Sequence, residues 1–135
     1  NRKLIENHSV CNRITMYEGS SINPAIIEKV KAHAEGKKCV MVILDSMHTH
    51  NHVLAELRAY APLVTIGSYC ILPDTFIEFF PPGHFSQDRP WDVGNNPHTA
   101  MKEFMSGNND FEVDRALDTK AMVTETIEGY LKRIN

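Results

Sequence analysis

The feature that most constrains the fold is an unbroken apolar run, Cys39–Leu44, which ends abruptly at Asp45. A strand with one face in water alternates apolar and polar residues, whereas a strand covered on both faces is apolar throughout. The run is far shorter than the roughly 20 apolar residues that a membrane span needs. It therefore predicts a central strand of a parallel sheet, covered by helices on both sides, with an acid at its carboxyl end.

Strand and helix patterns alternate around this run. A short β-prone segment covers 14–18, and a helix begins at Asn23-Pro24, which combine a favourable N-cap with a first-turn proline. A second helix is predicted over 51–61, and a second buried strand over 68–72. This order favours a parallel sheet with right-handed crossovers.

The last third of the chain has a different pattern. A loop from about 80 to 96, rich in Pro, Gly, Asp and Asn, precedes a helix that Asn96 caps. Two later segments, Lys120–Thr126 and Tyr130–Ile134, predict an antiparallel hairpin. We therefore expect one α/β domain over 1–135, whose mainly parallel sheet is covered by helices on both faces and ends in this hairpin.

Composition narrows the class of protein further. A chain of 135 residues suits a single domain, and 14 basic against 17 acidic residues give a net charge of −3. That balance argues against a nucleic-acid partner held by a basic face. We interpret the three cysteines, Cys11, Cys39 and Cys70, as reduced core thiols of a cytoplasmic protein. The sequence leaves open whether the chain forms a homo-oligomer.

Polar residues follow the carboxyl ends of the predicted strands. The turn Gly19-Ser20-Ser21 follows the first strand, Asp45 the second, and Asp74 the third. Ligands of open α/β sheets bind at this edge. His48, three residues after Asp45, is placed to take a proton from a substrate hydroxyl near a metal ion held by Asp45.

The segment from His48 to His52 admits a second interpretation. Its three histidines, His48, His50 and His52, stand at alternate positions, and imidazoles at such spacing can bind a transition metal in a hydrolase. The chain lacks the Asp-His pair that metallo-β-lactamase-like enzymes have after their His-x-His motif. The alternative is that His50 and His52 only begin a helix.

The segment ILDSMHTHNHVLAEL, residues 43–57, resembles the cephalosporin hydroxylase / rhamnosyl O-methyltransferase family. The same resemblance extends to RPW at 89–91, GNNP at 94–97 and EGYLKRI at 128–134, and it covers essentially the whole chain in order. It implies a class I methyltransferase fold, a Rossmann-like three-layer sandwich, that uses S-adenosylmethionine. It also implies transfer of a methyl group to a hydroxyl of a sugar or another small metabolite, with help from a divalent cation, usually Mg²⁺.

The resemblance also implies that two family features are missing. The family begins with a strand and a Gly-rich turn for the methionine part of the cofactor, followed by a strand that ends in an acid for the ribose. Neither pattern precedes Asn1, so the chain resembles the C-terminal part of the fold. Because the sequence does not begin with Met, we expect a fragment. The alternative is a truncated, non-catalytic relative that binds ligands through the same fold.

The resemblance assigns roles to the polar residues at the strand ends. Asp45 and Asp74 match metal-binding acids, and His48 matches the general base of related sugar O-methyltransferases. The turn Gly19-Ser20-Ser21 matches the one beside the adenosine, and we count Asp45 with it among the cofactor-binding residues.

The resemblance assigns further roles in and before the long loop. Trp91, Asn95 and Asn96 lie in the loop expected to cover the substrate. Pro73 stands where some metal-using relatives have a second acid, and a proline side chain cannot coordinate a cation. Glu78, a water or the substrate would then complete the ligands, since Mg²⁺ accepts one or two protein carboxylates plus waters.

Overall fold

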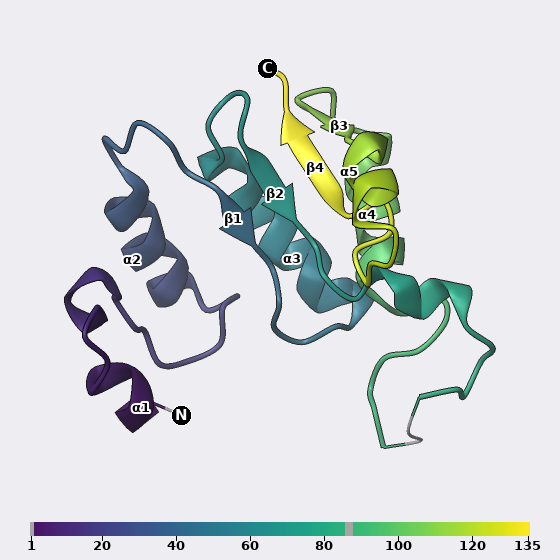
Figure 1. Cartoon of the computed structure of the whole chain (residues 1–135), viewed down its shortest axis with the longest axis horizontal. Coiled ribbons are helices and arrows are strands. Elements are labelled where there is room, and N and C mark those ends of the chain that lie inside the picture. Colours follow the sequence, from purple (N-terminus) through teal and green to yellow (C-terminus); the bar gives the residue numbers. More distant parts are fainter. Residues whose placement is uncertain (1, 86–87) are drawn as a thin grey trace.

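The sheet has four strands in the order β1-β2-β4-β3 in the computed structural model, which describes residues 2–85 and 88–135 (Figure 1). The strands are β1 (Val42–Ile43), β2 (Tyr69–Ile71), β3 (Phe111–Val113) and β4 (Tyr130–Arg133). β1 and β2 are parallel, whereas β4 runs antiparallel to both β2 and β3. The mixed α/β class is confirmed, but the prediction of a mainly parallel sheet is wrong, because β4 inserts between β2 and β3 in the reverse direction.

Three of the helices were predicted from local signals, and the structure confirms them. They are α2 (Pro24–Ala34), α3 (His50–Tyr60) and α4 (Pro97–Ser106). Asn23 caps α2 by accepting from the Ala25 amide at 2.9 Å, and Asn96 forms a capping box at the start of α4. The shorter elements are α1 (Arg2–Glu6), α5 (Arg115–Ala121), η1 (Cys11–Arg13), η2 (Ala61–Leu63) and η3 (Thr75–Phe79).

Two predicted strands are wrong. Residues 14–18 form no strand, and the side chains of Ile14 and Tyr17 remain exposed. Residues 120–126 end α5 and continue as irregular chain, so the predicted hairpin does not form. Asp114 caps α5 by accepting from the Ala116 amide at 3.1 Å, which starts a helix just before this segment. β4 pairs instead with β3, an element that the sequence pattern did not reveal.

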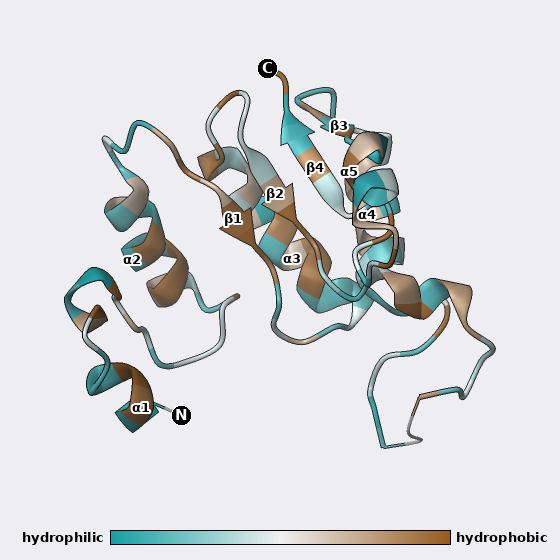
Figure 2. Ribbon diagram, in the orientation of Figure 1, coloured by the Kyte–Doolittle hydropathy of each residue, from teal (hydrophilic) through white to brown (hydrophobic). Residues whose placement is uncertain are grey.

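The apolar run Cys39–Leu44 contains an edge strand and not a central one. Only Val42 and Ile43 pair, and they pair on one side with β2. Leu44 is buried, but Ile43 is 55% exposed and Met41 is 54% exposed. The prediction that helices cover both faces of this strand is therefore wrong for the described residues. In Figure 2, β1 carries the brown colour of apolar residues at this open edge.

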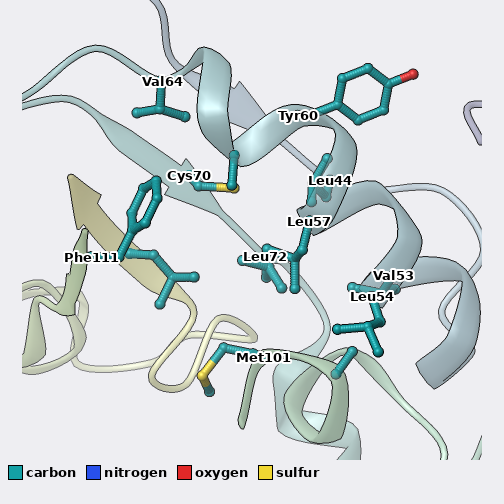
Figure 3. Packing of buried hydrophobic residues seen from close by; sticks show 13 residues of the cluster. Leu44, Val53, Leu54, Leu57, Tyr60, Val64, Cys70, Leu72, Met101 and Phe111 are labelled. Carbon is teal, nitrogen blue, oxygen red and sulfur yellow. The ribbon is translucent and has the colours of Figure 1, made fainter. Parts of the chain in front are cut away.

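The core lies between the sheet and the helix pair α3 and α4, which pack against each other (Figure 3). Leu57 of α3, Met101 of α4 and Leu131 of β4 are completely buried. Leu44 and Leu72, which follow β1 and β2, lie in the same core. Their burial fixes the carboxyl ends of both strands, where the candidate site begins. None of the described helices has the length and apolar character that crossing a bilayer requires.

The three cysteines are not all core residues. Cys70 is buried, but Cys11 and Cys39 are exposed, so the prediction of core thiols is wrong for those two.

Candidate functional site

Two acids and a histidine meet beyond the carboxyl ends of β1 and β2. Asp45 follows β1, Asp74 follows β2, and the parallel pairing of these strands places both acids at one edge. His48 Nε2 lies 3.3 Å from Asp45 Oδ1 and 3.3 Å from Asp74 Oδ2. The structure thus brings together three residues that were expected at one edge of the sheet.

These three side chains have the donor atoms of a cation site. One ligand atom from each of Asp45, His48 and Asp74 lies within 4.8 Å of the other two. Carboxylate oxygens suit Mg²⁺, which keeps several waters, whereas an imidazole suits transition metals. The side chain of Asp45 is 62% exposed, while those of His48 and Asp74 are mostly covered. The residues present therefore fit a hydrated divalent cation held mainly by the two carboxylates.

The backbone makes a sharp turn at Asp74. Its φ of 59° and ψ of 17° lie in the left-handed region, which few residues other than glycine adopt, although Asp tolerates it. Asp74 precedes η3 directly and follows Pro73, whose ring fixes its own φ. This turn carries the chain away from β2 while the Asp74 carboxylate faces His48.

Trp91 approaches the acid–histidine group from the long loop. The centroid of its ring is 5.6 Å from that of His48. The ring of Phe85 also packs against Trp91, at a centroid distance of 5.3 Å. Asn95 ties the same loop to the start of α3, because its Oδ1 accepts from the His50 amide at 2.9 Å. The loop therefore lies against the site, with an aromatic face beside His48.

Asn96 has a structural role in this loop. It is completely buried, and its Oδ1 accepts from the amides of His98 and Thr99. Its Nδ2 donates to Glu78 Oε2 and to the Asp92 carbonyl. We therefore place Asn96 in the framework of the loop and not among residues open to a substrate.

Glu78 is not one of the residues that approach the candidate cation site. Its Oε2 accepts from the Gly94 amide at 2.8 Å as well as from Asn96. Among the described residues, the group that could hold a metal ion consists of Asp45, His48 and Asp74 alone. The expectation that Glu78 completes the ligands of a cation is wrong, because its carboxylate is used to shape the loop.

The three histidines of the segment 48–52 point to different partners. His50 contacts α4, with Nδ1 2.9 Å from Thr99 Oγ1 and Nε2 3.1 Å from Glu103 Oε2. His52 turns the other way, and its Nε2 lies 3.0 Å from Ser21 Oγ. His50 and His52 stand two positions apart on α3 and so point to different sides of it, while His48 lies before the helix beside Asp45 and Asp74, so the three histidines share no centre. The alternative of a hydrolase metal site on these three residues is therefore wrong.

A pocket of about 450 Å³ lies between α2, β1 and α3. Its walls include Gly19 and Ser21 of the predicted cofactor turn, and Asp45 and Ser46 after β1. Ser20, between Gly19 and Ser21, is exposed and is not one of the wall residues. The turn and the strand end that were predicted to contact the cofactor therefore share one pocket, and Asp45 also belongs to the acid–histidine group.

Glu56 belongs to this pocket, and sequence reasoning missed it. The residue is 2% exposed, its Oε1 accepts from Ser46 Oγ at 2.8 Å, and its Oε2 has no partner among the described residues. Burial, followed by the nearby charge of Glu56, raises the pKa of the Cys70 thiol to about 12. The sequence does contain a signal for this residue. Glu56 is a charged residue at a helical position that shares the buried face of α3 with Val53 and Leu57.

Comparison with known proteins places this chain in a family. A family model described as rhamnosyl O-methyltransferase/CmcI matches residues 1–134. Curated proteins named rhamnosyl O-methyltransferase from Mycobacterium tuberculosis (strain ATCC 25618 / H37Rv) and Mycobacterium bovis (strain BCG / Pasteur 1173P2) are each 32% identical over 126 residues. That match covers 89% of this chain and 47% of each relative.

A protein of the same name from Mycobacterium leprae (strain TN) is 32% identical over 124 residues, which cover 89% of this chain and 50% of that protein. The chain thus spans about half the length of the curated relatives it matches. No solved structure matches it at comparable significance. The match through residues 1–134 shows that the chain belongs to the rhamnosyl O-methyltransferase/CmcI family.

Proposed function

We propose that the chain belongs to an S-adenosylmethionine-dependent O-methyltransferase that methylates a hydroxyl of a sugar or a similar small molecule, assisted by a divalent cation such as Mg²⁺. The convergence of Asp45, His48 and Asp74 beside Trp91, in a chain of this family, is the observation that carries the proposal. The name of the relatives, rhamnosyl O-methyltransferase, suggests the class of acceptor.

We assign the adenosine side of the methyl donor to the pocket between α2, β1 and α3. The pocket has the size of small-molecule sites and combines apolar walls from Ile26 and Val30 with polar atoms from Ser21 and Ser46. The family resemblance places the methionine portion on a Gly-rich turn that this sequence does not contain, so only part of the donor site is assigned here. S-adenosylmethionine supplies a methyl group on a sulfonium, which is already a good leaving group.

The residues of the acid–histidine group supply proton transfer and orientation in this proposal. The His48 imidazole accepts the proton of the acceptor hydroxyl, and the carboxylates of Asp45 and Asp74, each 3.3 Å from its Nε2, stabilise the resulting imidazolium. Held by these two carboxylates, a divalent cation would lower the pKa of that hydroxyl. Trp91 covers the site beside His48 and limits access of water.

Positioning supplies the largest share of the rate in this scheme. Alignment of two reactants is worth an effective molarity on the order of 10⁵–10⁸ M, whereas a positioned base adds about 10²–10⁴-fold. The hydrogen bonds that fix the loop through Asn95 and Asn96 therefore matter for catalysis even though Asn96 is buried.

The direct test is methyl transfer by the native protein from isotopically labelled S-adenosylmethionine to a rhamnosyl glycoside. We expect transfer that stops when EDTA is added and returns with excess Mg²⁺. If EDTA does not change the rate of methyl transfer, the role of the cation is contradicted, whereas the methyltransferase activity is supported. Failure of the protein to transfer the methyl group to any hydroxylated acceptor would contradict the activity itself.

A second candidate function is a family member that binds a ligand without catalysis. Pro73 favours it, since this residue stands immediately before Asp74 and offers no ligand atom where some relatives have an acid. Calorimetry with S-adenosylmethionine, combined with the transfer assay, separates the two functions. Binding without transfer supports the non-catalytic candidate.

A further inference from the structure

Three polar side chains form a row along one face of α3. His52, Glu56 and Tyr60 follow one another at intervals of one helical turn, and such residues are neighbours on a helix surface. Each of them is largely covered from solvent. A row of this kind on the buried side of a helix calls for partners, because buried polar groups cost free energy unless they are hydrogen-bonded.

The partners come from the two segments that wall the pocket. His52 Nε2 lies 3.0 Å from Ser21 Oγ, and the Tyr60 hydroxyl donates to the Ser21 carbonyl. Glu56 Oε1 accepts from Ser46 Oγ at 2.8 Å and lies 3.7 Å from His52 Nε2. One face of α3 is thus bonded to the turn that contains Ser21 and to the segment after β1 that contains Ser46.

The geometry also orders the row internally. His52 Nε2 lies within hydrogen-bond distance of Ser21 Oγ, and the Glu56 carboxylate lies 3.7 Å from the same nitrogen. Burial, followed by the nearby charge of Glu56, raises the pKa of Tyr60, so its hydroxyl stays protonated and can donate. The row therefore makes two hydrogen bonds to Ser21 and accepts one from Ser46.

We infer that His52, Glu56 and Tyr60 are positioning residues, which we call the α3 clamp, and that they set the distance between the turn Gly19-Ser20-Ser21 and Ser46. In doing so the α3 clamp fixes the width of the pocket between α2, β1 and α3. The consequence for binding the methyl donor rests on the proposed function, whereas the bonds to the turn do not.

The structural part of the inference is tested by hydrogen exchange in the free chain. The Asn23 amide donates to the Ser20 carbonyl at 3.0 Å and so reports the order of the turn. Tyr60→Phe removes only a hydroxyl, and we expect exchange at Asn23 to accelerate about two- to tenfold, as the loss of one hydrogen bond predicts. Tyr69→Phe is the matched control, because it removes a hydroxyl that donates to Asp114, far from the turn in sequence.

The functional part is tested by calorimetry with S-adenosylmethionine. Tyr60→Phe and Glu56→Gln are expected to weaken binding about two- to tenfold, with little change in turnover at saturating donor, while Tyr69→Phe binds as the wild type does. If Glu56→Gln does not fold, the milder Tyr60→Phe still decides the question.

The outcomes separate this inference from the proposed function. Unchanged exchange at Asn23 in Tyr60→Phe overturns the α3 clamp, whatever the protein binds. Accelerated exchange in a protein whose wild type binds no S-adenosylmethionine supports the α3 clamp and contradicts the proposed function. Accelerated exchange with unchanged donor affinity overturns the role of the α3 clamp in binding.

Discussion

His48 Nε2 lies 3.3 Å from Asp74 Oδ2, although the two residues belong to different loops. The contact depends on the sheet, because Val42 pairs with Cys70 and Ile43 pairs with Ile71 in β1 and β2. A slip of one residue in this register would reverse the direction of every side chain on one strand. The buried leucines Leu44 and Leu72, which follow the two strands, prevent such a slip and so hold the acid–histidine group together.

Replacement of His48 tests its assignment as the base. His48→Gln is expected to lower turnover at saturating substrates by about 10²–10⁴-fold, because a positioned base contributes that much. Initial rates of methyl transfer measure the effect. His50→Gln is the matched control, since His50 bonds to Thr99 and Glu103 of α4 and should affect stability more than turnover. Equal turnover in His48→Gln and the wild type would exclude the role.

Cation binding can be measured without any assay of activity. We expect Asp45→Asn and Asp74→Asn each to weaken Mg²⁺ or Mn²⁺ binding by at least roughly tenfold, the loss typical of removing even an indirect partner of a metal ligand. Calorimetry, or the electron paramagnetic resonance signal of Mn²⁺, measures the affinity. Asp110→Asn is the control, because Asp110 is exposed and lies outside the group of three. A wild type with no affinity for either cation would contradict the site.

Glu128 makes the stability of the chain depend on pH. Its carboxylate accepts from Lys102 at 2.6 Å and also pairs with His98 and Arg115, which lowers its pKa from 4.5 to about 2. A carboxyl with a depressed pKa stabilises the fold above its unfolded pKa, and this contribution disappears as the pH falls from about 4.5 to about 2.

The variant Glu128→Gln isolates this contribution. We expect the variant to have a free energy of unfolding about 1–3 kcal/mol below that of the wild type near pH 7. This difference in free energy should become smaller as the pH approaches 2. Urea unfolding at several pH values measures both effects. Glu112→Gln changes an exposed carboxylate on β3 and serves as the control. A constant difference between Glu128→Gln and the wild type across this range would refute the assigned pKa.

Gly129 marks a close approach between backbones. A Cβ at this position would lie 2.3 Å from the Leu72 carbonyl oxygen and 2.8 Å from Thr126 Cγ2. Gly129→Ala is therefore expected to destabilise the fold by at least about 1–3 kcal/mol, the typical cost of overpacking. Thermal unfolding measures the change. Gly107→Ala, where an added Cβ meets nothing within 4 Å, should be nearly neutral, and an equal effect of both variants would contradict the explanation.

The parts of the fold that were predictable have local causes. Two helices begin at an Asn-Pro pair, Asn23-Pro24 and Asn96-Pro97. Such a pair predicts a helix start, because the Asn side chain caps the helix and the proline has a fixed helical φ. The acids at Asp45 and Asp74 were predictable because they end apolar segments. Their meeting with His48 required only that the strands before them be parallel neighbours.

The remaining features depend on contacts between distant segments. Nothing local in Phe111–Val113 indicates that it will pair with Tyr130–Arg133, and the pairing decides that most of the sheet is antiparallel. Residues 14–18 have strand propensity, but a strand forms only where a partner lies alongside, and none does among the described residues. The sequence shows Glu56 as a charged residue on the apolar face of α3, but it does not show the partner Ser46, which the fold brings to it.

The open side of β1 has a consequence for the chain in solution. On this side β1 pairs with none of the described residues, and such an edge offers a row of free amide and carbonyl groups to any other extended backbone. Met41 and Ile43, which also line the pocket between α2, β1 and α3, add exposed apolar side chains at this place. The segment Cys39–Leu44 contains neither a proline nor a charged residue that would oppose such contact. Concentrated samples of this polypeptide should therefore be prone to edge-to-edge aggregation, and a lysine in place of Ile43 should suppress it.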